Sequence, residues 1–185
     1  MRTKPRFEGI LARLCWRDER ASQIAEFAVS LPLLVLFVVG IFDFSQALSL
    51  KQKLTNAAEE GARVAASDPA SDMYAVPRPV SVNDAFYVVE NYLLSENISV
   101  CGLPGTITQN QLTWTYANNT GCPGTMTLSI NRGCATLVNG VNVVGTCVTI
   151  TYPYKWSYSN VAGLFGPSAA PPGVISTTAA AFNEN

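Results

Sequence analysis

Residues 21–42 read ASQIAEFAVSLPLLVLFVVGIF, and this stretch decides the fold. From Phe27 to Phe42 it holds no charged residue, as is typical of a segment that lies in a membrane. A membrane-spanning helix needs about 20 residues, so we place the membrane part at residues 24–44. That choice brings the carboxylate of Glu26 to the leading edge of the span. A charge so close to hydrocarbon is costly, and it calls for a partner.

The apolar pattern continues past the end of this run, at the three- and four-residue spacings of one helix face. No proline between Pro32 and Pro69 stops a helix. We therefore predict one helix over residues 22–66, about 65 Å long at 1.5 Å per residue. Pro32 should loosen or bend it. The predicted face comprises Phe44, Ala47, Leu48, Leu54, Ala58, Gly61, Ala62 and Ala65. The transmembrane residues include Phe27, Pro32, Gly40 and Phe42, and Asp43 is expected at the outer membrane interface.

The residues before the apolar stretch form a basic leader, residues 1–21. Its first 20 residues hold six lysines or arginines against three acids, whereas the rest of the chain holds six against ten. A basic segment next to an apolar run fits the positive-inside rule, which places this end in the cytosol. The body of the chain is mildly acidic, so no nucleic-acid partner is predicted.

The cysteine and histidine content restricts the chemistry. The chain has no histidine, which removes the commonest general base and the usual zinc ligand. We therefore predict no enzyme activity, no catalytic residue, no metal and no cofactor. Besides Cys15, the four cysteines all follow the apolar run and indicate disulfides in an oxidising compartment. No pair has the CxxC spacing that would favour zinc. Of the three possible connectivities we favour Cys101–Cys122 with Cys134–Cys147, because each closes a short glycine-rich loop.

Residues 67–185 are predicted to form one α+β domain. After a proline-rich break, helical spacing predicts a short helix over Val82–Leu94 with Ser81 or Asn83 as N-cap. Beyond residue 99, alternation at period two predicts an antiparallel sheet, with a turn at Asn139-Gly140. The strands are expected at Thr108–Tyr116, Thr125–Asn131, Val143–Tyr154 and Gly173–Phe182.

Aromatic residues recur along these strands: Trp114, Tyr116, Tyr152, Tyr154, Trp156 and Tyr158. A row of aromatic rings can bind a sugar, but such residues more often fill the core of a sheet. We favour the core. Asp68 and Asp72 flank the loop that follows the long helix, and a calcium site there is the alternative for these two carboxylates.

The position of Glu26 suggests how the long helix is used. A cut after Ala21 would create a free amine at Ser22, with Glu26 as the fifth residue. In a stack of helices, the amine of one chain can pair with Glu26 of its neighbour and neutralise both charges. Two other interpretations stay open. One is a plain signal anchor; the other is a secretory signal cut after Ser45-Gln46-Ala47.

Several of these residues together resemble TadE-like proteins, which are pilin-related minor subunits of tight-adherence (Flp-type) pilus systems. The resemblance is carried by Ser22–Phe27, Leu31–Leu34, Phe42–Phe44, Ala57–Arg63 and Val148–Tyr154. TadF and TadG proteins share the N-terminal pattern, and the length of this chain suits TadE or TadF. Members usually have glycine at the position that Ala21 occupies here.

The resemblance implies a pilin-like α+β fold and a function in assembling a pilus for adhesion and surface attachment. It implies a single-pass protein of the bacterial inner membrane, with a cytoplasmic N-terminus and a periplasmic C-terminal domain. It also implies a prepilin peptidase, other Tad pilus subunits and the assembly platform as partners. Assembly would use Glu26 and Phe27, and processing would use Ala21 and Ser22. The alternative is a secreted or membrane-anchored module that binds carbohydrate or protein.

Overall fold

The computed structural model describes residues 19–69, 71, 78–138, 140–157 and 173–183. The chain divides into two compact units, Met1–Phe42 and Asp43–Asn185, referred to below as the N-terminal and C-terminal units. Helix α1, Glu19–Ser67, contributes to both. It is a few residues longer than predicted, and Pro32 lies inside it without ending it.

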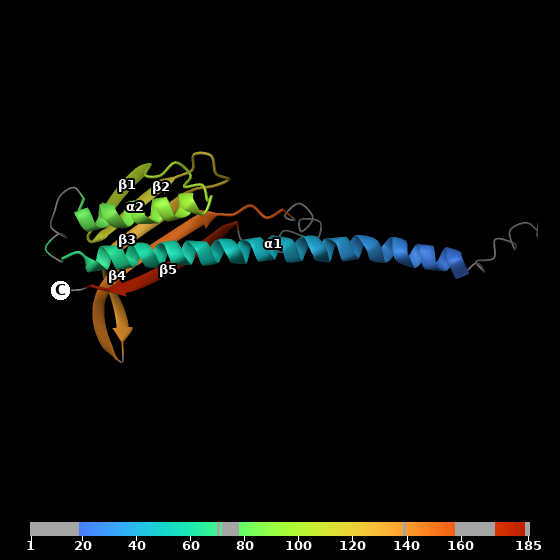
Figure 1. Cartoon of the computed structure of the whole chain (residues 1–185), viewed down its shortest axis with the longest axis horizontal. Coiled ribbons are helices and arrows are strands. Elements are labelled where there is room, and N and C mark those ends of the chain that lie inside the picture. The colour runs from blue at the N-terminus through green and yellow to red at the C-terminus, as the bar shows by residue number, and fades with distance from the viewer. Residues whose placement is uncertain (1–18, 70, 72–77, 139, 158–172, 184–185) are drawn as a thin grey trace, which may run out of the picture. The chain divides into compact units, whose positions relative to one another are not determined.

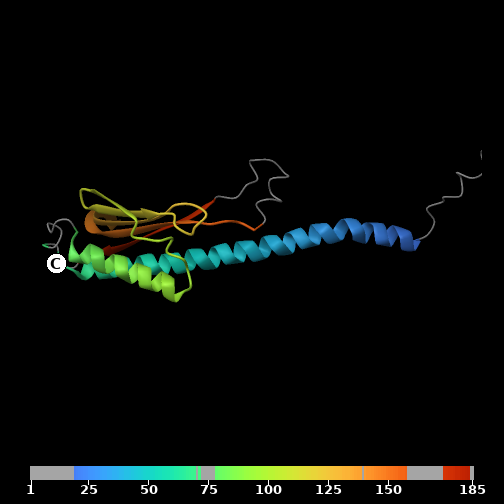
Figure 2. The same cartoon turned by 90° about the horizontal axis from the view of Figure 1, so that it is seen from above.

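The C-terminal unit is a sheet covered by helices on one face. Figure 1 labels the elements, and Figure 2 shows α2 and the Asp43–Ser67 part of α1 as one layer beside the sheet. Helix α2 spans Val80–Ser95. The strands are β1 Thr106–Asn110, β2 Thr113–Asn118, β3 Met126–Val138, β4 Val141–Pro153 and β5 Val174–Phe182. They pair in the order β1-β2-β3-β4-β5, every neighbour antiparallel. The predicted α+β, pilin-like class is confirmed.

One predicted strand was wrong. Residues 108–116 form two strands, because the chain reverses at Gln111, where φ is +51°. Glycine usually marks such a turn, and its absence here hid the reversal. Strands β3 and β4 are longer than predicted and converge on Gly140, where φ is +82°. Asn139, the other residue of the predicted turn, lies outside the described residues.

The predicted N-caps of α2 were also wrong. The helix begins two residues earlier than expected and is preceded by Pro79, so no side chain caps it. Ser81 lies within the helix and is completely buried. Pro79 is the N-cap residue, with φ −59° and an extended ψ of 149°, and the helix begins at the next residue.

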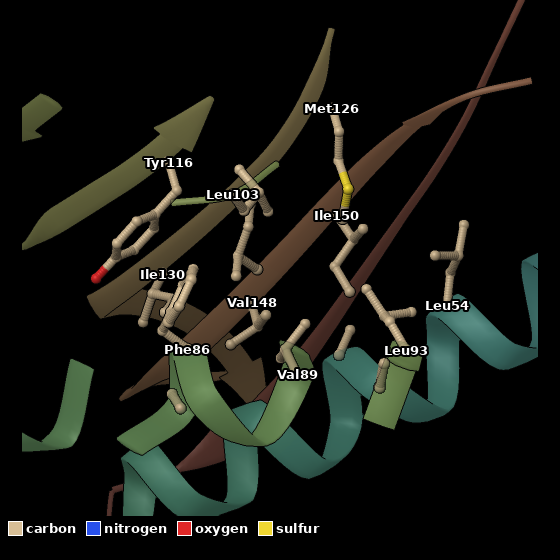
Figure 3. Packing of buried hydrophobic residues seen from close by; sticks show 14 of the residues in the cluster. Leu54, Phe86, Val89, Leu93, Leu103, Tyr116, Met126, Ile130, Val148 and Ile150 are labelled. Carbon is tan, nitrogen blue, oxygen red and sulfur yellow. The ribbon is translucent and has the colours of Figure 1, made fainter. Parts of the chain in front are cut away.

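The core lies between the sheet and the two helices. In Figure 3, Phe86, Val89 and Leu93 of α2 point toward the inner face of the sheet, and Leu54 does so from α1. The sheet contributes Tyr116, Met126, Ile130, Val148 and Ile150. Trp114 and Tyr116 are fully buried, as the core interpretation of the aromatic residues predicts. Tyr158 lies outside the described residues.

Apart from Leu54, the apolar part of the buried face of α1 consists of small residues, so α2 can approach closely. A β-carbon added to Gly61 would lie only 2.6 Å from Cγ2 of Val89. The predicted face needs correction at its beginning, where Phe44 and Leu48 are 59% and 48% exposed. Both precede the part of α1 that α2 covers. The buried alanines are Ala47, Ala57, Ala58, Ala62, Ala65 and Ala66.

Candidate functional site

The described part of the N-terminal unit is a helix, and from residue 23 to residue 42 its apolar side chains are exposed. The large ones are Ile24, Phe27, Val29, Leu31, Leu33, Leu34, Val35, Leu36, Phe37, Val38, Val39, Ile41 and Phe42. Among the described residues, this is the one helix long and apolar enough to cross a membrane. Soluble monomers rarely expose a continuous apolar surface of this size. The segment is therefore a candidate single membrane span.

Glu26 is the only charged residue between residues 23 and 42. Its side chain is exposed, and no described residue bonds to its carboxylate. One turn further on, the Ser30 hydroxyl donates a 2.7 Å hydrogen bond to the Glu26 backbone carbonyl. The helix thereby satisfies the hydroxyl, whereas the carboxylate remains available to a partner outside the chain.

The predicted processing junction lies in the first turns of α1. Ala21 and Ser22 follow closely after Glu19, where the helix begins. Ser22 and Glu26 are four residues apart, so a helix places them on one face, one turn from each other.

Two residues of the predicted span bear on how closely other helices can approach. Pro32 has no N–H for the Ala28 carbonyl, which leaves one acceptor of the helix unused. An added β-carbon at Gly40 would have no atom within 4 Å. Phe27 and Phe42, near the ends of the charge-free run, are 65% and 66% exposed. Within the described part of the N-terminal unit, no other element covers these side chains.

Asp43 is buried, and its place at the outer membrane interface stays a prediction. It is only 3% exposed, inside the C-terminal unit. Its Oδ2 accepts a 2.7 Å hydrogen bond from the Ser157 backbone N–H, and its Oδ1 accepts a 3.0 Å bond from the Ser157 hydroxyl. The Tyr154 hydroxyl donates a 3.4 Å bond to the Asp43 carbonyl. The burial of Tyr154, together with the negative charge of Asp43, raises the pKa of that tyrosine.

Arg132 is a second buried polar residue that the sequence analysis did not single out. It is fully buried, and its guanidinium donates a 3.0 Å bond to the Asp68 carbonyl and a 3.3 Å bond to the Thr146 hydroxyl. Asp68 directly follows the last residue of α1, where a helix carries partial negative charge. Arg132 therefore fixes the end of α1 to the sheet. It is the only charged residue between Glu96 and Lys155, which is the signal that could have revealed it.

The four cysteines of the C-terminal unit form two disulfides, Cys101–Cys122 and Cys134–Cys147. This is the pairing of sequence neighbours that we favoured. The second joins β3 to β4 at the base of the hairpin that projects from the sheet in Figure 1. Among the described residues, no group of three or more potential ligands could hold a metal ion. Asp72 lies outside the described residues.

A groove runs between α1 and the outer edge of β5, with a volume of about 590 Å³. The helix contributes Glu59, Arg63, Ala66 and Ser67, and the strand contributes Ala179–Phe182. No described residue forms a hydrogen bond or ion pair with the side chain of Glu59 or Arg63. The groove therefore presents one negative and one positive side chain that are available for binding.

Residues 21–63 match the family model described as TadE-like protein. This segment is TadE-like. The match begins at the predicted processing junction and includes both Glu26 and Gly61. It links the chain in general to the Tad pilus system, as a pilin-related protein with one candidate membrane span. No curated protein and no solved structure matches the chain.

Proposed function

We propose that this protein is a membrane-anchored minor pilin or pseudopilin that takes part in assembling a Tad-type pilus. One observation carries the proposal: the TadE-like segment is a helix with its apolar surface wholly exposed and a single carboxylate, Glu26, near its start. A helix that only anchored a domain would have no need of a charge there. A helix that must leave the bilayer and pack against other subunits can pair such a charge with a group on a neighbouring subunit.

In the proposed mechanism, a prepilin peptidase cuts after Ala21 and releases the leader, residues 1–21, on the cytoplasmic side. The new amine at Ser22 then pairs with Glu26 of a neighbouring subunit. A charge in hydrocarbon is costly, by about 2.5–3.5 kcal/mol at the centre of a bilayer, and the pairing neutralises both charges in the apolar interior of the fibre. Phe27 and the residues up to Phe42 would lie first in the inner membrane and then in the apolar centre of the fibre.

The proposed location is the bacterial inner membrane, with the N-terminus in the cytoplasm and the C-terminal unit in the periplasm. The basic leader supports this orientation through the positive-inside rule. The two disulfides support it as well, because such bonds persist in oxidising compartments. The proposed partners are other Tad pilus subunits and the assembly platform, and the role is structural rather than catalytic. The lack of histidine anywhere in the sequence supports that last point.

The test replaces Glu26 by alanine and, separately, by aspartate. We expect Glu26→Ala to leave the protein in the membrane fraction and to abolish pili in electron micrographs. Glu26→Asp, which keeps the charge, should restore part of the assembly. The matched control is Glu60→Gln, which changes an exposed carboxylate later in the same helix. Normal pili with Glu26→Ala would contradict the proposal.

Sequencing the N-terminus of the mature protein separates the remaining alternatives. A start at Ser22 supports processing as a pilin, and Ala21→Leu should then block it. A start at Leu48 would instead indicate a secreted module. The buried positions of Trp114 and Tyr116 already make a sugar-binding row of aromatic rings less suitable as a function.

A further inference from the structure

Among the described residues, both edges of the sheet are open. In the ranges that the structure describes, no strand pairs with the outer side of β1 or of β5. Natural proteins usually protect such edges with charged residues or proline, because an open edge can add a strand from another chain. Neither β1, TITQN, nor β5, VISTTAAAF, contains a charge or a proline. These edges are therefore suited to binding a further strand.

The directions of the two strands allow identical copies to join side by side. Since every neighbouring pair is antiparallel, the first and fifth strands run in the same direction. When β1 of one copy pairs parallel with β5 of another, both copies keep the same orientation; antiparallel pairing would reverse the second copy. Copies that are anchored in one membrane must share one orientation relative to it. This requirement holds whatever path α1 takes before Asp43.

The groove beside β5 has the form of a slot for a strand. Its helical residues, Glu59, Arg63, Ala66 and Ser67, are spaced as on one face of a helix. Its strand residues, 179–182, are consecutive, and consecutive residues of a strand point to opposite faces. The groove therefore follows the edge of β5, on the side where α1 lies.

The side chains of β1 fit this slot. Ile107 is paired with Tyr116, and Gln109 with Trp114. Residues directly opposite each other in a sheet share a face, and both aromatic partners are buried in the core beneath the helices. Ile107 and Gln109 therefore point to the helical side of the sheet, where both are exposed.

The register follows from a row of residues that crosses the whole sheet. The pairings place Thr108, Thr115, Ser129, Thr149 and Thr178 opposite one another in sequence. Continuing this row into the next copy sets its Thr108 beside Thr178 and its Gln109 beside Ala179, which lines the groove. The Gln109 amide donates one 3.3 Å hydrogen bond to the Gln111 carbonyl. Its second N–H and its oxygen remain, so it can still donate to a carboxylate and accept from a guanidinium.

We propose that β1 of one copy of this protein adds to β5 of the next, with Gln109 between Glu59 and Arg63. This inference rests on the proposed function for the common orientation of the copies. The contact uses different surfaces on its two sides, so it repeats from copy to copy and builds a ring or a filament.

The test is cross-linking in membranes that carry the full chain. One copy carries Thr108→Cys, and a second, differently tagged copy carries Thr178→Cys. An added oxidant forms disulfides between cysteines whose Cα atoms lie within about 7 Å of each other. We expect a mixed dimer, and a ladder of higher multimers when one chain carries both changes. Ser129→Cys replaces Thr108→Cys as the matched control, because it lies in the same row at the centre of the sheet. It should give no mixed dimer.

The groove is tested in the same assay. Arg63→Gln together with Glu59→Gln should lower the yield of the mixed dimer several-fold, whereas Glu60→Gln, which lies outside the groove, should not. Cross-links between two copies of Thr178→Cys, or equal yields with Ser129→Cys, would overturn the pairing of β1 with β5. Suppose that a strain makes normal pili, loses them with Glu26→Ala, and yields no mixed dimer. That result would overturn the contact between β1 and β5 alone, and the proposed function would stand.

Discussion

Asp43 accepts both a backbone and a hydroxyl hydrogen bond from Ser157, at 2.7 and 3.0 Å, across 114 positions of the sequence. Asp43 is the first residue of the C-terminal unit. Before it, α1 exposes its apolar side chains; from it onward, residues of α1 pack in the core. The pair therefore ties the start of the C-terminal unit to the residues that follow β4.

Asp43→Ala should lower the free energy of unfolding of the C-terminal unit by about 1.5–3 kcal/mol, because two donors of Ser157 lose a charged acceptor. Asp43→Asn keeps one acceptor oxygen and should cost less. Chemical unfolding of the detergent-solubilised chain measures both. As a control, Asp84→Ala removes an exposed carboxylate from α2 and should stay within about 0.5 kcal/mol of the wild type. Equal stabilities of Asp43→Ala and Asp84→Ala would show that the Ser157 contact contributes nothing.

Arg132 makes a similar connection at the other end of the packed part of α1. Arg132→Met should lower the free energy of unfolding by about 1.5–3 kcal/mol, because the bonds to Asp68 and Thr146 are charge-assisted. Arg132→Lys should recover only part of this loss, since an ammonium lacks the planar fork that reaches both oxygens. Thermal unfolding provides the measurement, with Lys155→Met as the exposed control. Full recovery by lysine would refute the need for two directed bonds.

Gly61 sets the distance between the two helices. Gly61→Ala should cost about 1–3 kcal/mol of stability, since its new β-carbon would meet Cγ2 of Val89 at 2.6 Å. The matched control is Gly40→Ala in the same helix, where an added β-carbon meets nothing within 4 Å. That change should leave the C-terminal unit as stable as before. Val89→Ala combined with Gly61→Ala should be less harmful than the sum of the single changes, because the clash is removed. Additive losses would contradict a direct contact.

The parts of this fold that could be predicted are those whose signal is local. The helix α1 follows from an uninterrupted pattern at helical spacing, and the TadE-like match covers the same segment. The disulfide pairing joined sequence neighbours. By contrast, the partner of Asp43 lies 114 residues away and the Asp68 carbonyl lies 64 residues from Arg132, so no nearby pattern indicates either contact.

Other features were missed because local signals were absent or misleading. Alternation at period two runs through residues 108–116 although the chain reverses at Gln111, because that turn uses no glycine. The open edge of β5 and its groove arise only when α1 and the sheet meet. Their residues, such as Glu59 and Arg63, look like an ordinary solvated helix face in the sequence.

Because of its buried tyrosines, the folded protein should lose stability as the pH becomes alkaline. Burial raises the pKa of Tyr116 above its usual 10.0, with the nearby Arg78 opposing part of that rise. In the unfolded chain this tyrosine loses its proton near pH 10, whereas in the folded protein it keeps the proton to a higher pH. The folded state then binds more protons, so the free energy of unfolding falls as the pH rises above 10.

Tyr116→Phe should make this decline shallower, because phenylalanine has no proton to lose. Unfolding by denaturant at a series of pH values from neutral to alkaline measures the slope, and ultraviolet absorbance of tyrosinate follows ionisation in the folded protein. Arg78→Gln should delay ionisation further, since it removes the charge that favours the tyrosinate. An unchanged slope in Tyr116→Phe would show that the loss of stability in alkali comes from other groups, with Tyr152 and Tyr154, whose pKa values are also raised, as the next to replace.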